Sequence, residues 1–144
     1  MDPKLLNLID TAIQREEDAY AFYRGLHARV QDPAVREAID WIAGEEQKHK
    51  AFLVKYRQGD FGASALRLSD VTYYKIAEHQ EEPAVNADMN SAEVYLVAAH
   101  RERRSNQFYT ALADQHAAGE ARDMLLRMAN EELKHKEKME YLYT

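Results

Sequence analysis

The sequence has 144 residues, the size of one ordinary domain, and a chain of this length can bury a sizeable core. The formal net charge of −6 argues against nucleic acid and anionic membrane surfaces as partners, because both attract clustered Lys and Arg. The absence of Cys excludes disulfides, thiolate metal sites, iron–sulfur clusters and Cys nucleophiles. With only five Gly and three Pro among many good helix formers, the composition predicts an all-α protein.

Neither a targeting signal nor a membrane span is expected. The first residues, Met-Asp-Pro-Lys-Leu-Leu, lack the basic and apolar regions of a signal peptide, and no apolar run approaches the ~20 residues that span a bilayer. A cytoplasmic protein is the simplest interpretation. The one basic cluster, Arg101, Arg103 and Arg104, is expected to form a solvated helix face.

The first part of the chain, residues 3–57, predicts two helices joined by a short turn. Asp2 and Pro3 are a typical helix start, and Asp32 with Pro33 ends the first helix and caps the second. Apolar residues recur at spacings of three and four in both helices. Charged or imidazole groups interrupt each apolar stripe in line with it: Glu16 in the first helix, and Glu46 and His49 in the second.

Residues 58–89 predict a long connection. The Gly-rich stretch after Gln58 and the Glu81-Glu82-Pro83 sequence break the helical pattern, and a short helix is expected near Ser69–Glu78. A connection of this length can cross the end or the side of a helical bundle.

Two more helices are predicted over residues 90–143. The third begins near Asn90 or Ser91 and carries Glu102 in its apolar stripe, and the fourth follows a short turn at Ala117–Gly119 and carries Glu132 and His135. Short loops within each pair and a long link between the pairs predict two antiparallel hairpins. The predicted fold is a four-helix bundle with a long crossover between helices 2 and 3.

The two hairpins repeat one pattern at a constant offset. Glu46-Gln47-Lys48-His49 corresponds to Glu132-Leu133-Lys134-His135, and 132 − 46 = 86. The stretch from Ala12 to Glu16, followed by Phe22-Tyr23, corresponds to the stretch from Ala98 to Glu102, followed by Phe108-Tyr109, and 102 − 16 is again 86. The chain therefore reads as two copies of one two-helix unit.

Four carboxylates and two imidazoles in one apolar core predict a metal site. Residues three apart share a helix face, so each Glu-x-x-His pair can hold one ion. Four buried, uncompensated carboxylates would be forced to protonate, whereas two divalent cations would cancel their charge. An oxygen-rich set with one imidazole per metal suits iron or manganese, and zinc can also bind. The predicted ligands are Glu16, Glu46, His49, Glu102, Glu132 and His135.

Each part of the predicted metal site also has a simpler structural interpretation. A single Glu-x-x-His is usually a surface pair, and a lone His on an apolar face is usually a core residue. Another choice of ligands is possible, because the sequence also has Glu17, Glu45 and Glu131 next to predicted ligands. The set with Glu16 and Glu102 is preferred for two reasons: Arg103 takes the neighbouring position in the third helix, and this alignment keeps the Phe-Tyr pairs of the two halves at the same offset. Tyr23 and Tyr109, seven residues after their Glu, either pack in the core or hydrogen-bond a ligating carboxylate.

The sequence resembles the rubrerythrin family of the ferritin-like superfamily over nearly its whole length. The motifs that carry the resemblance are Ala-Ile-x-x-Glu16-x-x-Ala-x-x-Phe-Tyr, Glu46-x-x-His49, Ala-x-x-x-Glu102-x-x-Ser-x-x-Phe-Tyr and Glu132-x-x-His135. The resemblance implies one ferritin-like domain over 1–144, with half-repeats 3–57 and 90–143 and the connection 58–89. It also implies that Glu46 and Glu132 bridge the metals, that Glu16 and Glu102 are terminal ligands, and that each His caps one iron.

The chain departs from this family in two respects. Rubrerythrins proper carry a Cys-rich rubredoxin domain that delivers electrons, and this chain has no Cys. Some members also place an extra Glu three residues after the third-helix ligand, where this chain has Ser105. The first departure requires an external reductant, and the second weakens the peroxidase assignment.

The resulting functional prediction is a di-iron oxidoreductase that reduces hydrogen peroxide or dioxygen with an external electron donor protein. Two iron ions per chain, a homodimer, and no nucleic-acid or membrane partner are expected. One alternative is a ferroxidase or iron-storage protein, which would assemble into a cage or take up more iron. Another is a metal-dependent sensor or binding module, in which mutation of Glu46 and Glu132 would abolish a partner's response instead of peroxide consumption.

Overall fold

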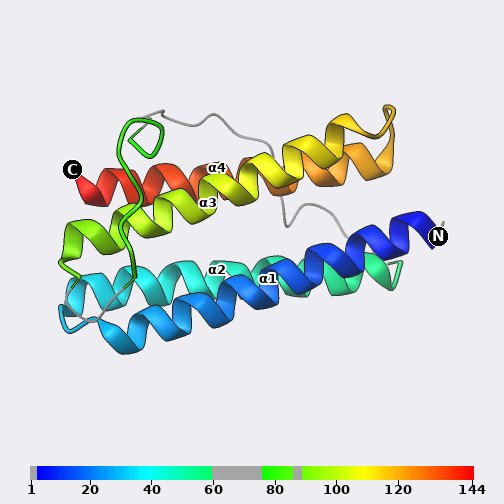
Figure 1. Cartoon of the computed structure of the whole chain (residues 1–144). Helices are drawn as coiled ribbons and strands as arrows, with labels where there is room; N and C mark the ends of the chain where they lie inside the picture. Colours follow the sequence, from blue (N-terminus) through cyan, green and yellow to red (C-terminus); the bar gives the residue numbers. More distant parts are fainter. Residues whose placement is uncertain (1–2, 60–75, 86–88) are drawn as a thin grey trace. The chain divides into compact units, whose positions relative to one another are not determined.

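The computed structural model of the chain describes residues 3–59, 76–85 and 89–144. These residues form four α-helices and, within these ranges, no β-strand, so the predicted all-α class is confirmed. The helices are α1 (Pro3–Arg29), α2 (Pro33–Arg57), α3 (Ser91–Asp114) and α4 (Glu120–Tyr143) (Figure 1). The chain divides into two compact units, Met1–Ala65 and Leu66–Thr144, which are taken separately below.

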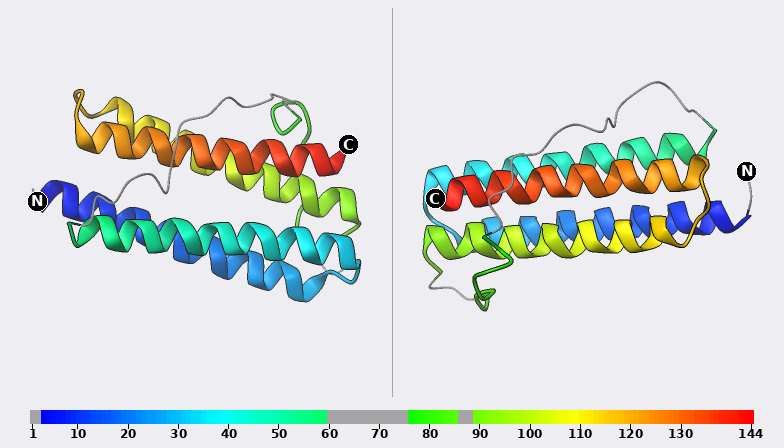
Figure 2. Two further views of the ribbon diagram at one scale, coloured as in Figure 1. Left: turned by 180° about the vertical axis from the view of Figure 1, so that it is seen from behind. Right: turned by 90° about the horizontal axis from the view of Figure 1, so that it is seen from above.

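The first unit contains the hairpin of α1 and α2. The two helices run side by side in opposite directions (Figures 1 and 2). Asp32 is the N-cap of α2, because its carboxylate accepts a hydrogen bond from the backbone N–H of Ala34 at 2.9 Å, and Pro33 follows at the first helical position. The sequence prediction for this turn is confirmed, and the predicted cap at Asp2 lies outside the described residues.

The second unit contains the hairpin of α3 and α4 (Figure 2). Asn90 and Glu93 form a capping box at the start of α3: the Asn90 side chain accepts from the backbone N–H of Glu93 at 2.9 Å, and the Glu93 carboxylate accepts from the backbone N–H of Asn90. Gly119, at φ 153°, provides the turn into α4. Side chains other than Gly rarely adopt this conformation, so the turn requires Gly.

The capping box gives a local stability prediction. Asn90→Ala is expected to lower the free energy of unfolding by about 1 kcal/mol, because the backbone N–H of Glu93 loses its acceptor. Urea unfolding of the full chain, followed by circular dichroism, measures the difference. Asn90→Ser retains an acceptor and is the matched control; an equal loss in both variants would contradict the capping explanation.

The connection between the units is described only in part. Of the short helix expected near Ser69–Glu78, residues 69–75 lie outside the described range. The remainder is a hydrogen-bonded turn, in which the backbone N–H groups of His79 and Gln80 both donate to the carbonyl of Ile76 at 3.0 Å. The predicted helix thus lies mostly outside the described residues and stays a prediction, and its last residues belong to this turn.

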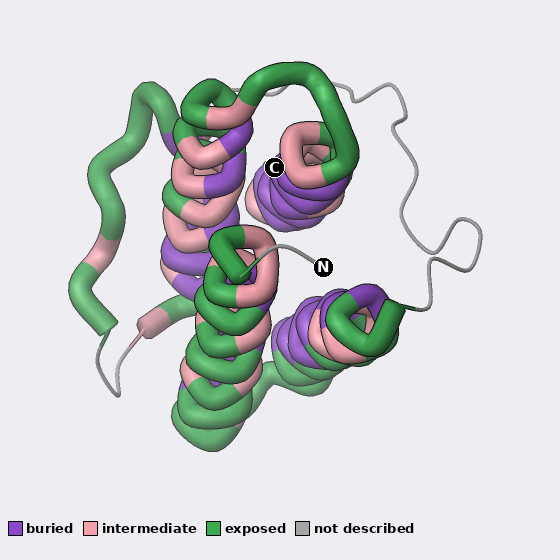
Figure 3. The backbone as a smooth tube through the Cα atoms, turned by 90° about the vertical axis from the view of Figure 1, so that its right-hand side faces the viewer, coloured by how far each residue is buried: buried purple, intermediate pink, exposed green. Residues whose placement is uncertain are grey.

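Buried residues form a stripe along one side of each helix (Figure 3). These stripes contain the predicted apolar residues, and the glutamates and histidines predicted to interrupt them are buried with them. No described helix is both long enough and apolar enough to cross a membrane. The four helices thus hold polar groups at core positions, which requires a chemical explanation.

Candidate metal centre

The first unit brings together three predicted ligands. Glu16 extends from α1, and Glu46 and His49 extend from α2, with exposed fractions of 2%, 1% and 2%. One ligand atom from each lies within 4.8 Å of the others, and His49 Nδ1 is 3.6 Å from Glu16 Oε2. The Glu46 and His49 side chains share a face because three residues are close to one helical turn.

The second unit repeats this arrangement with the equivalent residues. Glu102 of α3 and Glu132 and His135 of α4 have exposed fractions of 1%, 1% and 2%. Their ligand atoms also lie within 4.8 Å of one another, and His135 Nδ1 is 3.3 Å from Glu102 Oε1. Each hairpin thus contains a half-site of two carboxylates and one imidazole, as the 86-residue repeat of the sequence predicts.

The chemistry of each half-site fits a divalent metal ion. A buried carboxylate pair without a compensating cation is costly, whereas a cation of charge two balances both carboxylates. The donors are oxygen and imidazole nitrogen, and the chain has no Cys to supply sulfur. Such a donor set suits iron or manganese, and zinc can also bind it.

The neighbouring glutamates differ from the predicted ligands in exposure and in ion pairing. The Glu17 side chain is 43% exposed and pairs with Lys50 at 3.0 Å. The Glu45 side chain is 23% exposed, with Lys48 at 3.5 Å. These lysine pairs and the greater exposure favour the register of Glu16 and Glu46.

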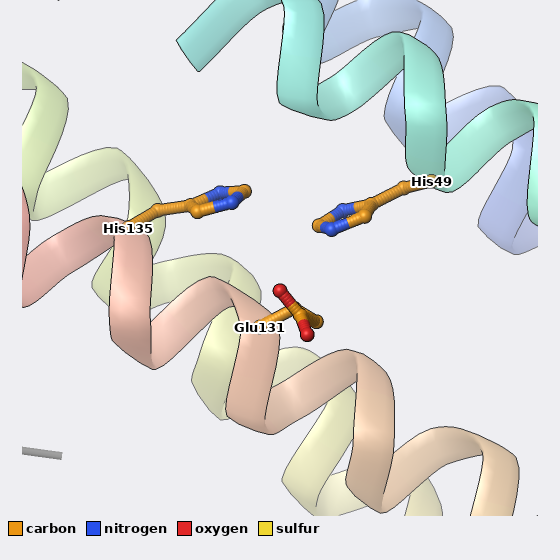
Figure 4. Close-up of side chains that lie close together, drawn as sticks. All are labelled: His49, Glu131 and His135. Carbon is orange, nitrogen blue, oxygen red and sulfur yellow. The ribbon is translucent and has the colours of Figure 1, made fainter. Parts of the chain in front are cut away.

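Glu131 is the remaining alternative donor in the second unit. Its side chain is 16% exposed and pairs with Lys134 at 2.9 Å. Figure 4 shows it on α4 together with His135, four residues further along, and also shows the side chain of His49 on α2. Because residues four apart share a helix face, Glu131 is placed close to the half-site, although it is less buried than Glu132.

The two predicted tyrosines are buried in equivalent surroundings. Tyr23 and Tyr109 are 0% and 1% exposed. Each contacts the preceding Phe edge-on, with ring centroids 5.4 Å apart for Phe22 and Tyr23 and 5.3 Å apart for Phe108 and Tyr109. This repeated packing accounts for their burial, and a hydrogen bond from either phenol to a ligand stays a prediction.

A second buried polar cluster was not predicted from the sequence. Lys136, Glu137 and Glu140 of α4 are 2%, 5% and 0% exposed. The Lys136 ammonium lies 2.9 Å from a carboxylate oxygen of Glu137, of Glu140 and of Glu78. The sequence signal was the Lys136 and Glu140 pair, four residues apart, beside the buried stripe.

The ion pairs of this cluster determine its charge states. Burial lowers the pKa of Lys136, but its hydrogen bonds to Glu137, Glu78 and Glu140 outweigh burial and raise that pKa above its ordinary value. Burial raises the pKa of Glu140, but the backbone N–H of Ala77, which donates to it at 2.7 Å, and the Lys136 ammonium bring that pKa below its ordinary value. Both groups are therefore held in their charged forms.

Comparisons with known proteins agree with this arrangement. The family model described as Rubrerythrin matches residues 7–143. A solved structure of a hypothetical protein from Pyrococcus furiosus is 24% identical, with a TM-score of 0.62, covering 96% of this chain and 87% of that chain. This likeness concerns the fold. No match was found among curated proteins.

Proposed function

Because this chain belongs to the rubrerythrin family, we propose that it is a di-iron carboxylate oxidoreductase that reduces hydrogen peroxide or dioxygen. The observation that carries the proposal is the pair of equivalent half-sites, each with two buried carboxylates and an imidazole whose ligand atoms lie within 4.8 Å. The rubrerythrin membership and the ferritin-like fold make iron the favoured metal, with manganese or zinc as substitutes.

In this proposal the six side chains of the two half-sites would hold two iron ions per chain. By the family resemblance, Glu46 and Glu132 would be bridging ligands, Glu16 and Glu102 would be terminal ligands, and His49 and His135 would each bind one ion. Bound iron supplies Lewis acidity and electrons for reduction of the oxidant. An external donor protein restores the electrons, since the chain has no Cys with which to hold a rubredoxin-type centre.

The protein's own residues prepare the ligands for this role. The six side chains are almost completely buried, so little water can compete with them for the metal. The same burial keeps water from competing with the oxidant for its place at the metal. The Glu102 carboxylate, 3.3 Å from His135 Nδ1, orients that imidazole, and Glu16 lies similarly near His49 in the first unit. In this proposal Tyr23 and Tyr109 hydrogen-bond ligating carboxylates. A single domain over 1–144, a homodimer and a cytoplasmic location complete the proposal.

Ser105 favours a second candidate function, the handling of iron without peroxide turnover. It lies three residues after Glu102 on α3, where some members of the family place an additional glutamate. Without that carboxylate, α3 supplies one predicted ligand, Glu102, and a spare donor for the second half-site would have to come from another helix, such as Glu131 of α4. A ferroxidase or storage protein needs no spare ligand, so dioxygen would then be the faster oxidant.

The metal content of protein expressed with supplemented iron is the first test. Elemental analysis should give about two irons per chain, and peroxide should oxidise the anaerobically reduced protein faster than dioxygen, as followed by the near-ultraviolet absorption of ferric iron. Faster oxidation by dioxygen would favour the ferroxidase. One metal or none, without a spectral change, would contradict both candidates.

Substitution of the proposed bridging ligands tests the assignment of residues. The Glu46→Ala/Glu132→Ala variant should lose both iron and peroxide consumption, because four of the predicted contacts to metal depend on these two carboxylates. Glu45→Ala is the matched control, since it removes the neighbouring carboxylate on the same helix and should retain iron. Loss of iron in the Glu45 variant alone would show that the other register is correct.

A further inference from the structure

Part of the connection is attached to the second unit by a series of polar contacts. We name Ile76–Glu82 the strap. The backbone N–H of Ala77 donates to Glu140 at 2.7 Å, and the His100 imidazole contacts the carbonyl of Gln80 at 2.8 Å. Ion pairs join Glu78 to Lys136 and Arg103, and Glu82 to Arg104. The strap therefore contacts both α3 and α4 through charged and hydrogen-bonding groups.

Glu78 contacts both helices through Oε1, and its Oε2 also accepts a hydrogen bond from Lys136 at 3.3 Å. Its Oε1 is 2.9 Å from Lys136 Nζ on α4 and 3.5 Å from Arg103 Nε on α3. Lys136 directly follows His135, and Arg103 directly follows Glu102. Glu78 thus joins the two ligand-bearing helices at the level of the half-site. The side chain of Lys136 is 3% exposed and that of Glu78 is 26% exposed, so solvent screens this pair less than a surface pair.

The first unit makes the equivalent connection without a strap. Lys50 corresponds to Lys136 and Glu17 to Arg103, since 136 − 50 and 103 − 17 both equal 86. Lys50 pairs directly with Glu17 at 3.0 Å, which joins α2 to α1 beside His49 and Glu16. In the second unit Arg103 occupies the place of that glutamate, so Lys136 cannot pair with this position of α3 directly. Glu78 supplies the missing carboxylate from the connection.

We propose that Glu78 is a positioning residue for the second half-site, with the role that Glu17 has in the first. Its carboxylate neutralises Arg103 and Lys136 and holds α3 and α4 at the separation that brings Glu102 within 3.3 Å of His135. Without this carboxylate, Arg103 of α3 is no longer joined to Lys136 of α4, which keeps its own partners Glu137 and Glu140, and the two ligands lose their preorganised geometry. The inference rests on the proposed function, because the half-site must bind metal for the positioning to matter.

Metal titration of the metal-free full-length chain tests this role. Binding of Co²⁺ is followed by calorimetry and by the visible absorption of the bound ion. Glu78→Gln keeps the shape of the side chain and removes its charge. It should weaken one of the two Co²⁺ affinities about tenfold and change the absorption of that ion. Loss of a residue that supports metal ligands usually lowers metal affinity by about 10-fold to 100-fold, and a residue that acts indirectly is expected at the lower end. Glu82→Gln breaks the neighbouring strap ion pair and should bind as the unmodified chain does.

A second substitution should restore binding. In Glu78→Gln/Arg103→Glu, the new carboxylate stands where Glu17 stands in the first unit and can pair directly with Lys136. Recovery of the weakened affinity and of the absorption would support positioning through charge, because a general loss of packing would not be repaired in this way. Equal affinities in Glu78→Gln and the unmodified chain, an equal loss in Glu82→Gln, or failure of the rescue would overturn the inference.

The outcomes also separate this inference from the proposed function. Two bound ions in the unmodified chain with no effect of Glu78→Gln would overturn only the role of Glu78, whereas no metal binding in the unmodified chain would overturn both. If Glu78→Gln loses helix content, Glu78→Asp decides, because it keeps the charge on a shorter side chain. Binding of both ions by that variant, with one affinity at most partly weakened, supports the inference, and complete loss of one ion with intact helix content overturns it.

Discussion

Replacing Lys136 by methionine is expected to lower the free energy of unfolding by about 3–5 kcal/mol at pH 7, the usual cost of removing one partner from a buried ion pair. Lys136 is 2% exposed and lies 2.9 Å from each of three carboxylates, those of Glu78, Glu137 and Glu140. Methionine fills a similar volume but leaves these carboxylates without their cation. The loss is therefore electrostatic, and urea unfolding at constant ionic strength measures it.

The pH dependence identifies the cause of that loss. In the unmodified protein the pKa of Glu140 is below its ordinary value, so its ion pair contributes stability above the unfolded pKa of about 4.5, and this is lost as the pH falls through the folded pKa. In Lys136→Met the buried Glu140 carboxylate loses the ammonium that lowers its pKa and protonates more readily, so the difference between the two proteins should shrink from pH 7 to pH 4. A difference that stays constant over this range would point to packing instead.

Lys138→Met is the matched control for this experiment. Lys138 is on the same helix, two residues away, and is exposed. Removing an exposed charge usually changes stability by no more than about 0.5 kcal/mol. A comparable loss in both variants would contradict a specific role for the buried ammonium.

Removing the metal is expected to lower the melting temperature at pH 7 by roughly 10 °C. A ligand present at a thousand times its dissociation constant adds about 4 kcal/mol, which corresponds to a shift of this size for a domain of about 150 residues. Without metal, the buried carboxylates of Glu16, Glu46, Glu102 and Glu132 lack the cations that would balance them. Scanning calorimetry of metal-free and iron-loaded protein measures the shift.

The same comparison at lower pH tests the electrostatic origin of the shift. As the carboxylates protonate, they repel each other less and bind metal less well, so the difference in melting temperature should shrink towards pH 5. Glu46→Ala/Glu132→Ala provides the control, since iron should leave its melting temperature unchanged. Equal melting temperatures of the metal-free and loaded protein at pH 7 would contradict a shared buried site.

The regular part of the protein could be predicted from its sequence because it is periodic. Pro33 and Asn90 determine where α2 and α3 begin, and the spacing of three and four residues places Glu16 and Glu102 among the buried groups. The 86-residue offset then predicts that both hairpins have the same three-residue half-site. Each of these inferences depends on local geometry that repeats along a helix.

The contacts of the strap could not be predicted in this way. Lys136 pairs with Glu137 and Glu140 of its own helix and also with Glu78, from a segment without periodicity, and no local pattern specifies where such a segment lies. Arg103 and Arg104 were expected on a solvated face. Their side chains are 38% and 53% exposed, but both form ion pairs with the strap. The position of Arg103 beside Glu102 supported the choice of Glu102 as the predicted ligand. Its ion pair with Glu78 could not be inferred from the sequence.

In the part of the chain that the structure describes, the strap is present once and the hairpin is present twice. An assembly of two separate, identical hairpins would have to treat both of its metal positions alike. Within the described residues the strap contacts the second hairpin, with Glu78 between Arg103 and Lys136, whereas the first hairpin pairs Lys50 with Glu17. In the proposed di-iron protein, this asymmetry would permit the two metal positions to fill in a fixed order and to differ in reduction potential.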